Sequence, residues 1–102
     1  MELTVVDAPE RSRYEARTPD GAAAGVLMYK MSDSMVVVTH TEVDDEWEGQ
    51  GIGGRLVQGA LDDMRGRGLH VLPICPFTKA WIERHPDYQD LLFGAPPSRV
   101  TD

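Results

Sequence analysis

A glycine-rich stretch, residues 47–57, restricts the fold of this chain more than any other part of the sequence. It reads Trp-Glu-Gly-Gln-Gly-Ile-Gly-Gly-Arg-Leu-Val, so four glycines fall within six residues. Residues 36–43, which precede it, are rich in β-branched side chains and predict a strand. The apolar residues that follow recur at the spacing of one helix face: Ile52, Leu56, Val57, Ala60, Leu61 and Met64. The stretch therefore predicts a strand, a glycine loop and the start of a helix.

A helix that begins directly after a glycine loop is suited to binding an anion. Its first N–H groups have no partners inside the helix, and the helix dipole favours negative charge at that end. Because glycine has no Cβ, a ligand can approach these N–H groups closely. A phosphate or pyrophosphate is the expected ligand.

Two common phosphate-binding motifs do not fit the stretch. A Walker loop ends in Gly-Lys-Ser/Thr, whereas Gly54 is followed by Arg55 and Leu56. The dinucleotide fingerprint G-x-G-x-x-G matches at Gly49, Gly51 and Gly54. It also requires an acidic residue about 20 residues further on to hold a ribose, and residues 69–75 offer none.

The rest of the sequence predicts four antiparallel strands, then a helix, a strand and a second helix, which is an α/β fold with a mixed sheet. Arg, Glu and Lys side chains of the first strands are expected on exposed positions, whereas the apolar run 69–74 predicts a strand buried on both faces. Gly59 in the first helix costs up to ~1 kcal/mol relative to alanine, which close packing on the sheet would explain. The expected strands are 3–7, 12–17, 23–31, 36–43 and 69–74, and the expected helices are 51–67 and 76–84.

Length and composition predict a single domain, residues 1–93, followed by a tail, residues 94–102. No apolar run is long enough to span a membrane, and the N-terminus does not read as a signal peptide. The single cysteine agrees with a reducing cytoplasm, and the net charge of −7 argues against nucleic-acid binding. We therefore expect a cytoplasmic monomer.

Four segments in this order resemble the GNAT N-acetyltransferase superfamily, and specifically its small single-domain YjdJ-like subgroup. Gly51 and Gly53 match the glycines of its acyl-CoA loop, Gln/Arg-x-x-Gly-x-Gly/Ala, although Glu48 replaces the usual Gln or Arg. The segments are His-Thr-Glu-Val at 40–43, Gly-Gln-Gly-Ile-Gly at 49–53, Pro-Ile-Cys-Pro-Phe at 73–77 and His-Pro-Asp-Tyr-Gln-Asp-Leu-Leu at 85–92.

The resemblance implies binding of acetyl-CoA or CoA as cosubstrate and transfer of the acetyl group to a small amine or a protein amine. It implies hydrogen bonds from the strand edge at Thr41 and Val43 to the pantetheine amides. Two alternatives are a CoA-binding module with little or no transferase activity and an interaction domain that keeps only the fold. The loop amides that the resemblance places on the pyrophosphate are those of Gln50, Gly51, Ile52, Gly53 and Gly54.

Cys75 is the first candidate for the chemistry. It follows the last predicted strand and lies between Pro73 and Pro76, where the resemblance places the acyl thioester. A buried, inert thiol, a wall of the CoA pocket and a nucleophile are all compatible with this position. As a nucleophile it would need a pKa lowered by a helix N-terminus or a histidine.

Glu42 and His40 are the other candidates, because either could take the proton from an acceptor amine. Alternation along the strand puts them on one face with Val36 and Val38, so His40 also fits a core position. Glu42 is the better base. His70 is expected in the core and His85 as a helix cap, and no spacing suggests a metal site.

Overall fold

The structure is a computed structural model, and it describes residues 2–94. The predicted strands and helices are all present, with ends within one residue of those expected. The strands are β1 (Thr4–Ala8), β2 (Arg13–Arg17), β3 (Ala23–Ser32), β4 (Met35–Val43) and β5 (His70–Pro73); the helices are α1 (Ile52–Gly66) and α2 (Pro76–Glu83); and the short 3-10 turns are η1 (Pro9–Arg11), η2 (Asp45–Trp47) and η3 (Pro86–Leu91). Of the expected tail, residues 95–102 lie outside the described part of the chain.

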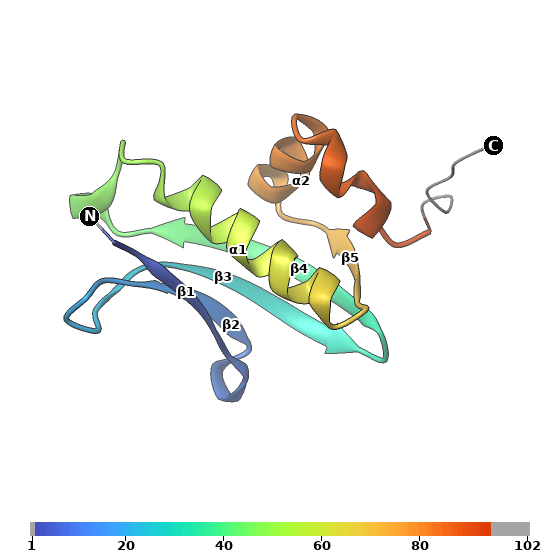
Figure 1. Cartoon of the computed structure of the whole chain (residues 1–102), viewed down its shortest axis with the longest axis horizontal. Coiled ribbons are helices and arrows are strands. Elements are labelled where there is room, and N and C mark those ends of the chain that lie inside the picture. The colour runs from blue at the N-terminus through green and yellow to red at the C-terminus, as the bar shows by residue number, and fades with distance from the viewer. Residues whose placement is uncertain (1, 95–102) are drawn as a thin grey trace.

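The five strands form one mixed sheet in the order β1-β2-β3-β4-β5. The first four strands are antiparallel to their neighbours, and β5 is parallel to β4. Helix α1 makes the connection between β4 and β5 and lies across one face of the sheet (Figure 1). The C-terminal end of β4 therefore lies beside the N-terminus of α1, which is the arrangement that the glycine stretch predicts.

The core lies between this face of the sheet and α1. The apolar face of α1 is buried as its spacing predicts, and Gly59 packs directly against the sheet. A Cβ atom at Gly59 would lie 2.7 Å from the Cβ of Val5 on β1, so the predicted close packing is confirmed. The side chains of α1 that contribute to the core are those of Ile52, Leu56, Val57, Ala60, Leu61 and Met64.

The prediction that residues 69–74 are buried on both faces is wrong. Val71 is fully buried, but Leu72 is 39% exposed and Ile74 is 61% exposed. His70, which was expected in the core, is also exposed. The reason is that side chains alternate along β5, so that Val71 packs into the core and Leu72 lies on the other face of the strand, outside that core. His85 does cap a helix end, as predicted, because its Nδ1 lies 2.7 Å from the Trp81 carbonyl oxygen.

The expectation that the charged residues of the first strands are exposed is wrong for Glu15. Its residue surface is only 4% exposed, and its carboxylate forms ion pairs with Arg13 at 2.8 Å and Arg17 at 2.9 Å. Burial by itself raises the pKa of Glu15, but the hydrogen bonds from Arg13 and Arg17 outweigh burial and hold the pKa below its ordinary value. The arginines on the same strand cover this carboxylate from solvent.

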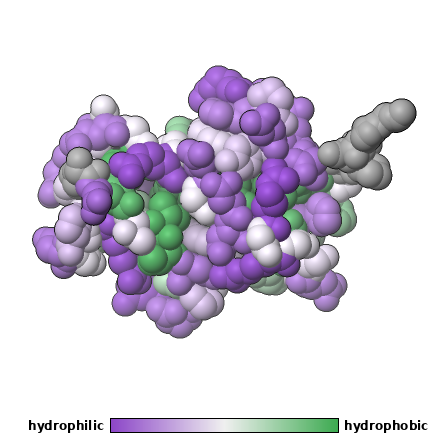
Figure 2. All heavy atoms as spheres, viewed as in Figure 1, coloured by the Kyte–Doolittle hydropathy of each residue, from purple (hydrophilic) through white to green (hydrophobic). Residues whose placement is uncertain are grey.

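The face of the molecule seen in Figure 2 is mostly hydrophilic, and its apolar residues form separate small patches. This agrees with the chain's excess of acidic residues, which gives a net charge of −7. Within residues 2–94, no helix is both long enough and apolar enough to cross a membrane.

Candidate functional site

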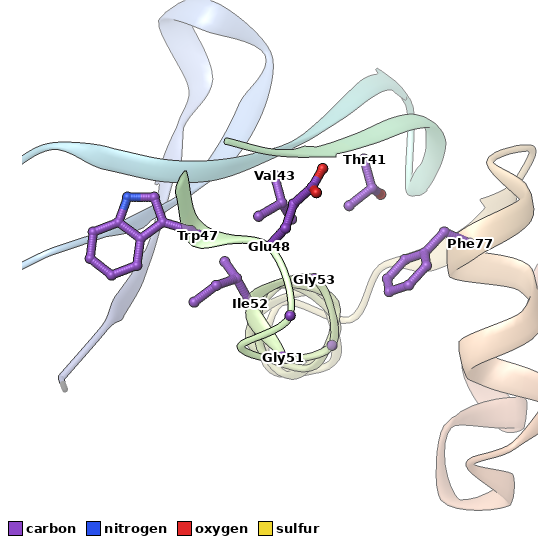
Figure 3. Close-up of a pocket in the computed structure, with 10 residues that line it drawn as sticks. Thr41, Val43, Trp47, Glu48, Gly51, Ile52, Gly53 and Phe77 are labelled. Atoms are coloured by element: carbon purple, nitrogen blue, oxygen red, sulfur yellow. The ribbon is translucent and has the colours of Figure 1, made fainter. Parts of the chain in front are cut away.

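A pocket of about 320 Å³ opens between the C-terminal end of β4 and the N-terminus of α1 (Figure 3). This volume falls at the lower end of the range for small-molecule sites, so it can hold part of an extended ligand. Of the residues predicted to bind a cosubstrate, Gln50 does not line it. The lining residues are Thr41, Val43, Trp47, Glu48, Gly49, Gly51, Ile52, Gly53, Gly54 and Phe77.

The glycine loop leaves several backbone donors free at the start of α1. Gly49 and Gly51 have φ angles of 81° and 74°, a left-handed conformation that favours glycine. The first backbone hydrogen bond of the helix joins the Arg55 N–H to the Gly51 carbonyl oxygen at 3.2 Å. The N–H groups of residues 52–54 therefore have no partner inside the helix, and all three residues line the pocket. This end of the pocket is suited to an anion.

Two aromatic side chains that sequence reasoning did not assign to the site form its sides. Trp47 lies on one side of the first turn of α1, and Phe77 lies on the other (Figure 3). The Phe77 ring packs directly on Gly53, because a Cβ atom there would lie 2.9 Å from the ring Cζ. Gly53 is therefore needed for the contact between α1 and α2 as well as for access to the backbone.

Cys75 is connected to the pocket by a hydrogen bond to Thr41, which lines it. The thiol is 4% exposed and donates a hydrogen bond to the Thr41 hydroxyl, with an Sγ–Oγ1 distance of 3.5 Å. Burial opposes ionisation, yet hydrogen bonds from Thr41 and from Thr78 and Phe77 on α2 outweigh it and lower the pKa of Cys75. A lowered pKa at a helix N-terminus is what the nucleophile hypothesis required.

His40 and Glu42 lie on the opposite face of β4 from the pocket. Met28 of β3 pairs with His40 and Tyr29 pairs with Val38, so Thr39 is an extra residue in β4 and forms a β-bulge. The bulge reverses the alternation of side chains, and the prediction that His40 and Glu42 share a face with Val36 and Val38 is wrong.

The side chains of His40 and Glu42 are 58% and 70% exposed, and they approach each other to 3.7 Å. Thr41 and Val43, which alternate with them, point to the pocket instead. Cys75 therefore lies one hydrogen bond away from the pocket, behind Thr41, whereas Glu42 lies on the other face of β4. Within residues 2–94, no three His, Cys, Asp or Glu side chains are arranged to hold a metal ion.

Comparison with known protein families decides the classification. A family model described as GCN5-related N-acetyl-transferase matches residues 13–91, which is most of the chain. The chain belongs to the GCN5-related N-acetyltransferase family. No curated protein matches the sequence.

The structure is similar to solved structures of proteins of different sizes. It is 25% identical to a GCN5-like protein of Staphylococcus aureus, with a TM-score of 0.68 and coverage of 92% of this chain and 91% of that one. It is 18% identical to the ribosomal-protein-S18-alanine N-acetyltransferase of Escherichia coli, with a TM-score of 0.58 over 71% of this chain and 49% of that enzyme. An acetyltransferase of Bacillus subtilis in complex with CoA is 19% identical, with a TM-score of 0.50 over 71% and 62% of the two chains. This chain therefore spans about half the length of the Escherichia coli enzyme.

Two positions of this GCN5-related chain depart from the family pattern that its sequence resembles. Glu48 replaces the first Gln or Arg of the acyl-CoA loop, and its carboxylate extends toward Thr41 in the pocket (Figure 3). The resemblance also implies a tyrosine in the helix after the last strand, which in many larger members can protonate the leaving CoA thiolate; here that position falls on Ile82 or Trp81, which are only 1% and 6% exposed. Neither side chain can supply a proton to a leaving thiolate.

Proposed function

We propose that this protein is an acetyl-CoA-dependent N-acetyltransferase that acts on a small amine or a protein amine. The observation that carries the proposal is the row of unpartnered amides at residues 52–54, which faces a pocket in a chain of this family. These amides, with those of Gln50 and Gly51, bind the pyrophosphate of CoA. The complex of the Bacillus subtilis relative with CoA supports CoA as the ligand.

The pantetheine arm binds along the free edge of β4. The parallel pairing of β4 with β5 runs only from Met35 to Val38 on β4. Beyond it, the amides of Ile74 and Cys75 both bond the Val38 carbonyl oxygen at 3.0 Å, and the two segments then separate. Residues 41–43 therefore have backbone groups that no strand pairs on this side, and these supply partners for the amides of the arm.

The acetyl group can be transferred to the amine by two routes. Cys75 is the nucleophile of the first route, and Glu42 is the general base of the second. In the first, the Cys75 thiolate attacks the thioester carbonyl, an acetyl-cysteine forms and CoA leaves as a thiolate; the amine then attacks the acetyl-cysteine carbonyl, Cys75 leaves as a thiolate, and the proton of the amine goes to the CoA thiolate or to water. In the second, the amine attacks the acetyl-CoA carbonyl directly, Glu42 or His40 takes its proton, either directly or through water, and the C–S bond breaks so that CoA leaves as a thiolate. The hydrogen bond to Thr41 and the lowered pKa of Cys75 support the first route. Glu42 and His40 lie on the exposed face of β4, away from the pocket, which speaks against the second route.

Mass spectrometry separates the routes. With acetyl-CoA and no acceptor, the first route predicts one acetyl group on Cys75, and Cys75→Ala abolishes turnover while CoA still binds. If Cys75 stays unmodified and Glu42→Gln is the more damaging variant, the direct route holds. If CoA binds but no amine of a broad panel is acetylated, the alternative function, a CoA-binding module, replaces the transferase.

The phosphate site needs a variant that does not also disturb α2. Gly53→Val would push its side chain into the Phe77 ring before it meets a ligand, because even a Cβ lies 2.9 Å from that ring. The double variant Gly53→Val, Phe77→Ala removes this collision, and Phe77→Ala alone is the matched control. We expect CoA to bind the control but to bind the double variant much more weakly. Equal affinities in folded proteins would refute the phosphate site.

The finer assignments belong to the same proposal. Mutual coverage above nine-tenths with the Staphylococcus aureus protein supports a small single-domain subgroup, which we take to be the YjdJ-like one, and a domain of residues 1–93. A cytoplasmic monomer rests on the composition alone, namely one cysteine and a net charge of −7.

A further inference from the structure

A short hydrogen-bond chain joins the buried Cys75, the half-buried Thr41 and the buried Thr78 beside the pocket. The Sγ atom of Cys75 lies 3.5 Å from Oγ1 of Thr41, which lies 3.3 Å from Oγ1 of Thr78. Thr78 is 0% exposed, and of the three residues only Thr41 lines the pocket. Buried hydroxyls need partners, so each member of this chain constrains the next.

Which group donates and which accepts in this hydrogen-bond chain depends on the charge of the Cys75 sulfur. Each hydroxyl donates one hydrogen bond and accepts others. When Cys75 is a thiol, its S–H donates to Thr41, and the Thr41 hydroxyl is free to donate to Thr78. When Cys75 is a thiolate, Thr41 must donate to the sulfur, and the Thr78 hydroxyl is then the donor to Thr41. Thr78 therefore completes the arrangement that stabilises the thiolate without touching the pocket.

We propose that Thr78 is a positioning residue, which orients the Thr41 hydroxyl toward Cys75 and so favours the thiolate in a site that has no charged partner for it. The use of that thiolate in acetyl transfer rests on the proposed function, but the hydrogen-bond chain does not. Because Thr41 lines the pocket, a ligand that takes the Thr41 hydroxyl as its own donor alters the ionisation of Cys75.

Uncharged groups account for the lowered pKa of Cys75. Burial opposes ionisation, and the groups that lower the pKa are the Thr41 hydroxyl, the N–H groups of Thr78 and Phe77, and the Thr78 hydroxyl, whose hydrogen-bond geometry joins it to Thr41 rather than to the sulfur. Most titratable side chains on the surrounding elements are exposed, namely His40 and Glu42 on β4, His70 on β5, Arg55, Asp62 and Arg65 on α1, and Lys79, Glu83 and Arg84 on or beside α2. Asp63 and His85 are half-buried, and their partners are Tyr14 and the Trp81 carbonyl oxygen. Glu48 is the charged group that faces this site, because its carboxylate extends toward Thr41 in the pocket.

The test is the pH profile of alkylation of Cys75 by iodoacetamide in the full-length protein without CoA. Cys75 is the one cysteine of the sequence, so the reaction reports on it alone. Thr78→Val keeps the shape of the side chain but loses the hydroxyl, and Thr78→Ser keeps the hydroxyl. Thr39→Val, on the same strand at the bulge, removes a hydroxyl that bonds the Met28 carbonyl instead and is the matched control.

For Thr78→Val we expect the midpoint of the profile to move to higher pH and alkylation at pH 7 to slow roughly threefold to tenfold. Thr78→Ser and Thr39→Val keep the wild-type midpoint. An unchanged midpoint in Thr78→Val, or an equal shift in Thr78→Ser, would overturn the proposal, because packing rather than the hydroxyl would then be responsible.

A second variant covers the case in which Thr78→Val does not fold, as judged by its melting curve. Thr41→Val removes the direct partner of the sulfur and moves the midpoint upward at least as far; an unchanged midpoint there overturns the proposal. The proposed function can fail independently of this proposal. A protein that does not bind CoA can still show the shift of the alkylation midpoint caused by Thr78→Val.

Discussion

The packing of α1 on β1 leads to a prediction whose size can be derived from the structure. In Gly59→Ala, the new methyl group would lie 2.7, 2.9 and 3.0 Å from three side-chain atoms of Val5. Ordinary contacts begin at 3.4 Å, so the helix and the strand must separate by about 0.7 Å at this point. The nearest atom is the Cβ of Val5, which cannot move without its backbone. Overpacking of this kind costs about 1–3 kcal/mol, against a gain of up to ~1 kcal/mol from replacing glycine in a helix.

Gly66→Ala is the matched control, because it lies in the same helix and a Cβ there meets nothing within 4 Å. Urea denaturation gives the free energy of unfolding of both variants, and the difference between them is the cost of the contact with Val5. We expect Gly59→Ala to be less stable than Gly66→Ala by about 1–3 kcal/mol. Since the proposed phosphate site lies at the N-terminus of α1, CoA affinity should fall in Gly59→Ala alone. Equal free energies of unfolding for the two variants would refute this packing of the helix on β1.

Two further predictions concern charge. Glu48→Gln removes a carboxylate from the pocket, so we expect CoA affinity by calorimetry to rise roughly threefold to tenfold at low salt and by less at high salt; weaker binding would mean that Glu48 assists the ligand. Glu15→Gln should lower the free energy of unfolding by about 1.5–3 kcal/mol at pH 7. Because the pKa of Glu15 is lowered in the folded state, this loss should be complete above the ordinary glutamate pKa and should shrink as the pH falls below it. A loss that does not depend on pH would show that packing, not charge, is responsible.

Local patterns were sufficient to predict the strands, the helices and the glycine loop before α1. The glycines at 49 and 51 are required by left-handed backbone, and the helical spacing after Ile52 matches the buried face of α1. These features depend on residues that are neighbours in the sequence, so the sequence contains the information directly.

The errors concern features that depend on the tertiary arrangement. Nothing in the composition of β4 marks Thr39 as a bulge, because the extra residue is defined by pairing with β3, and a single bulge moves His40 and Glu42 to the other face. Which face of β5 packs into the core likewise decides that Leu72 is exposed.

The sides of the pocket were missed for the same reason. Phe77 meets Gly53 only because α2 packs beside the first turn of α1. The thiol of Cys75 meets the Thr41 hydroxyl only because the segment after β5 lies beside β4. Residue types at these positions suggested candidates, but the partners that set their chemistry come from distant parts of the chain.

The central claim is that the amides at the start of α1 bind the pyrophosphate of CoA, and NMR titration of the isotope-labelled protein tests it most directly. On addition of CoA, we expect the largest amide shifts at Ile52, Gly53 and Gly54, with further shifts at residues 41–43. Pantetheine, which lacks the pyrophosphate, should shift residues 41–43 and leave the three loop amides in place. Binding of CoA with unchanged loop amides, or no shift at any residue at millimolar CoA, would contradict the claim.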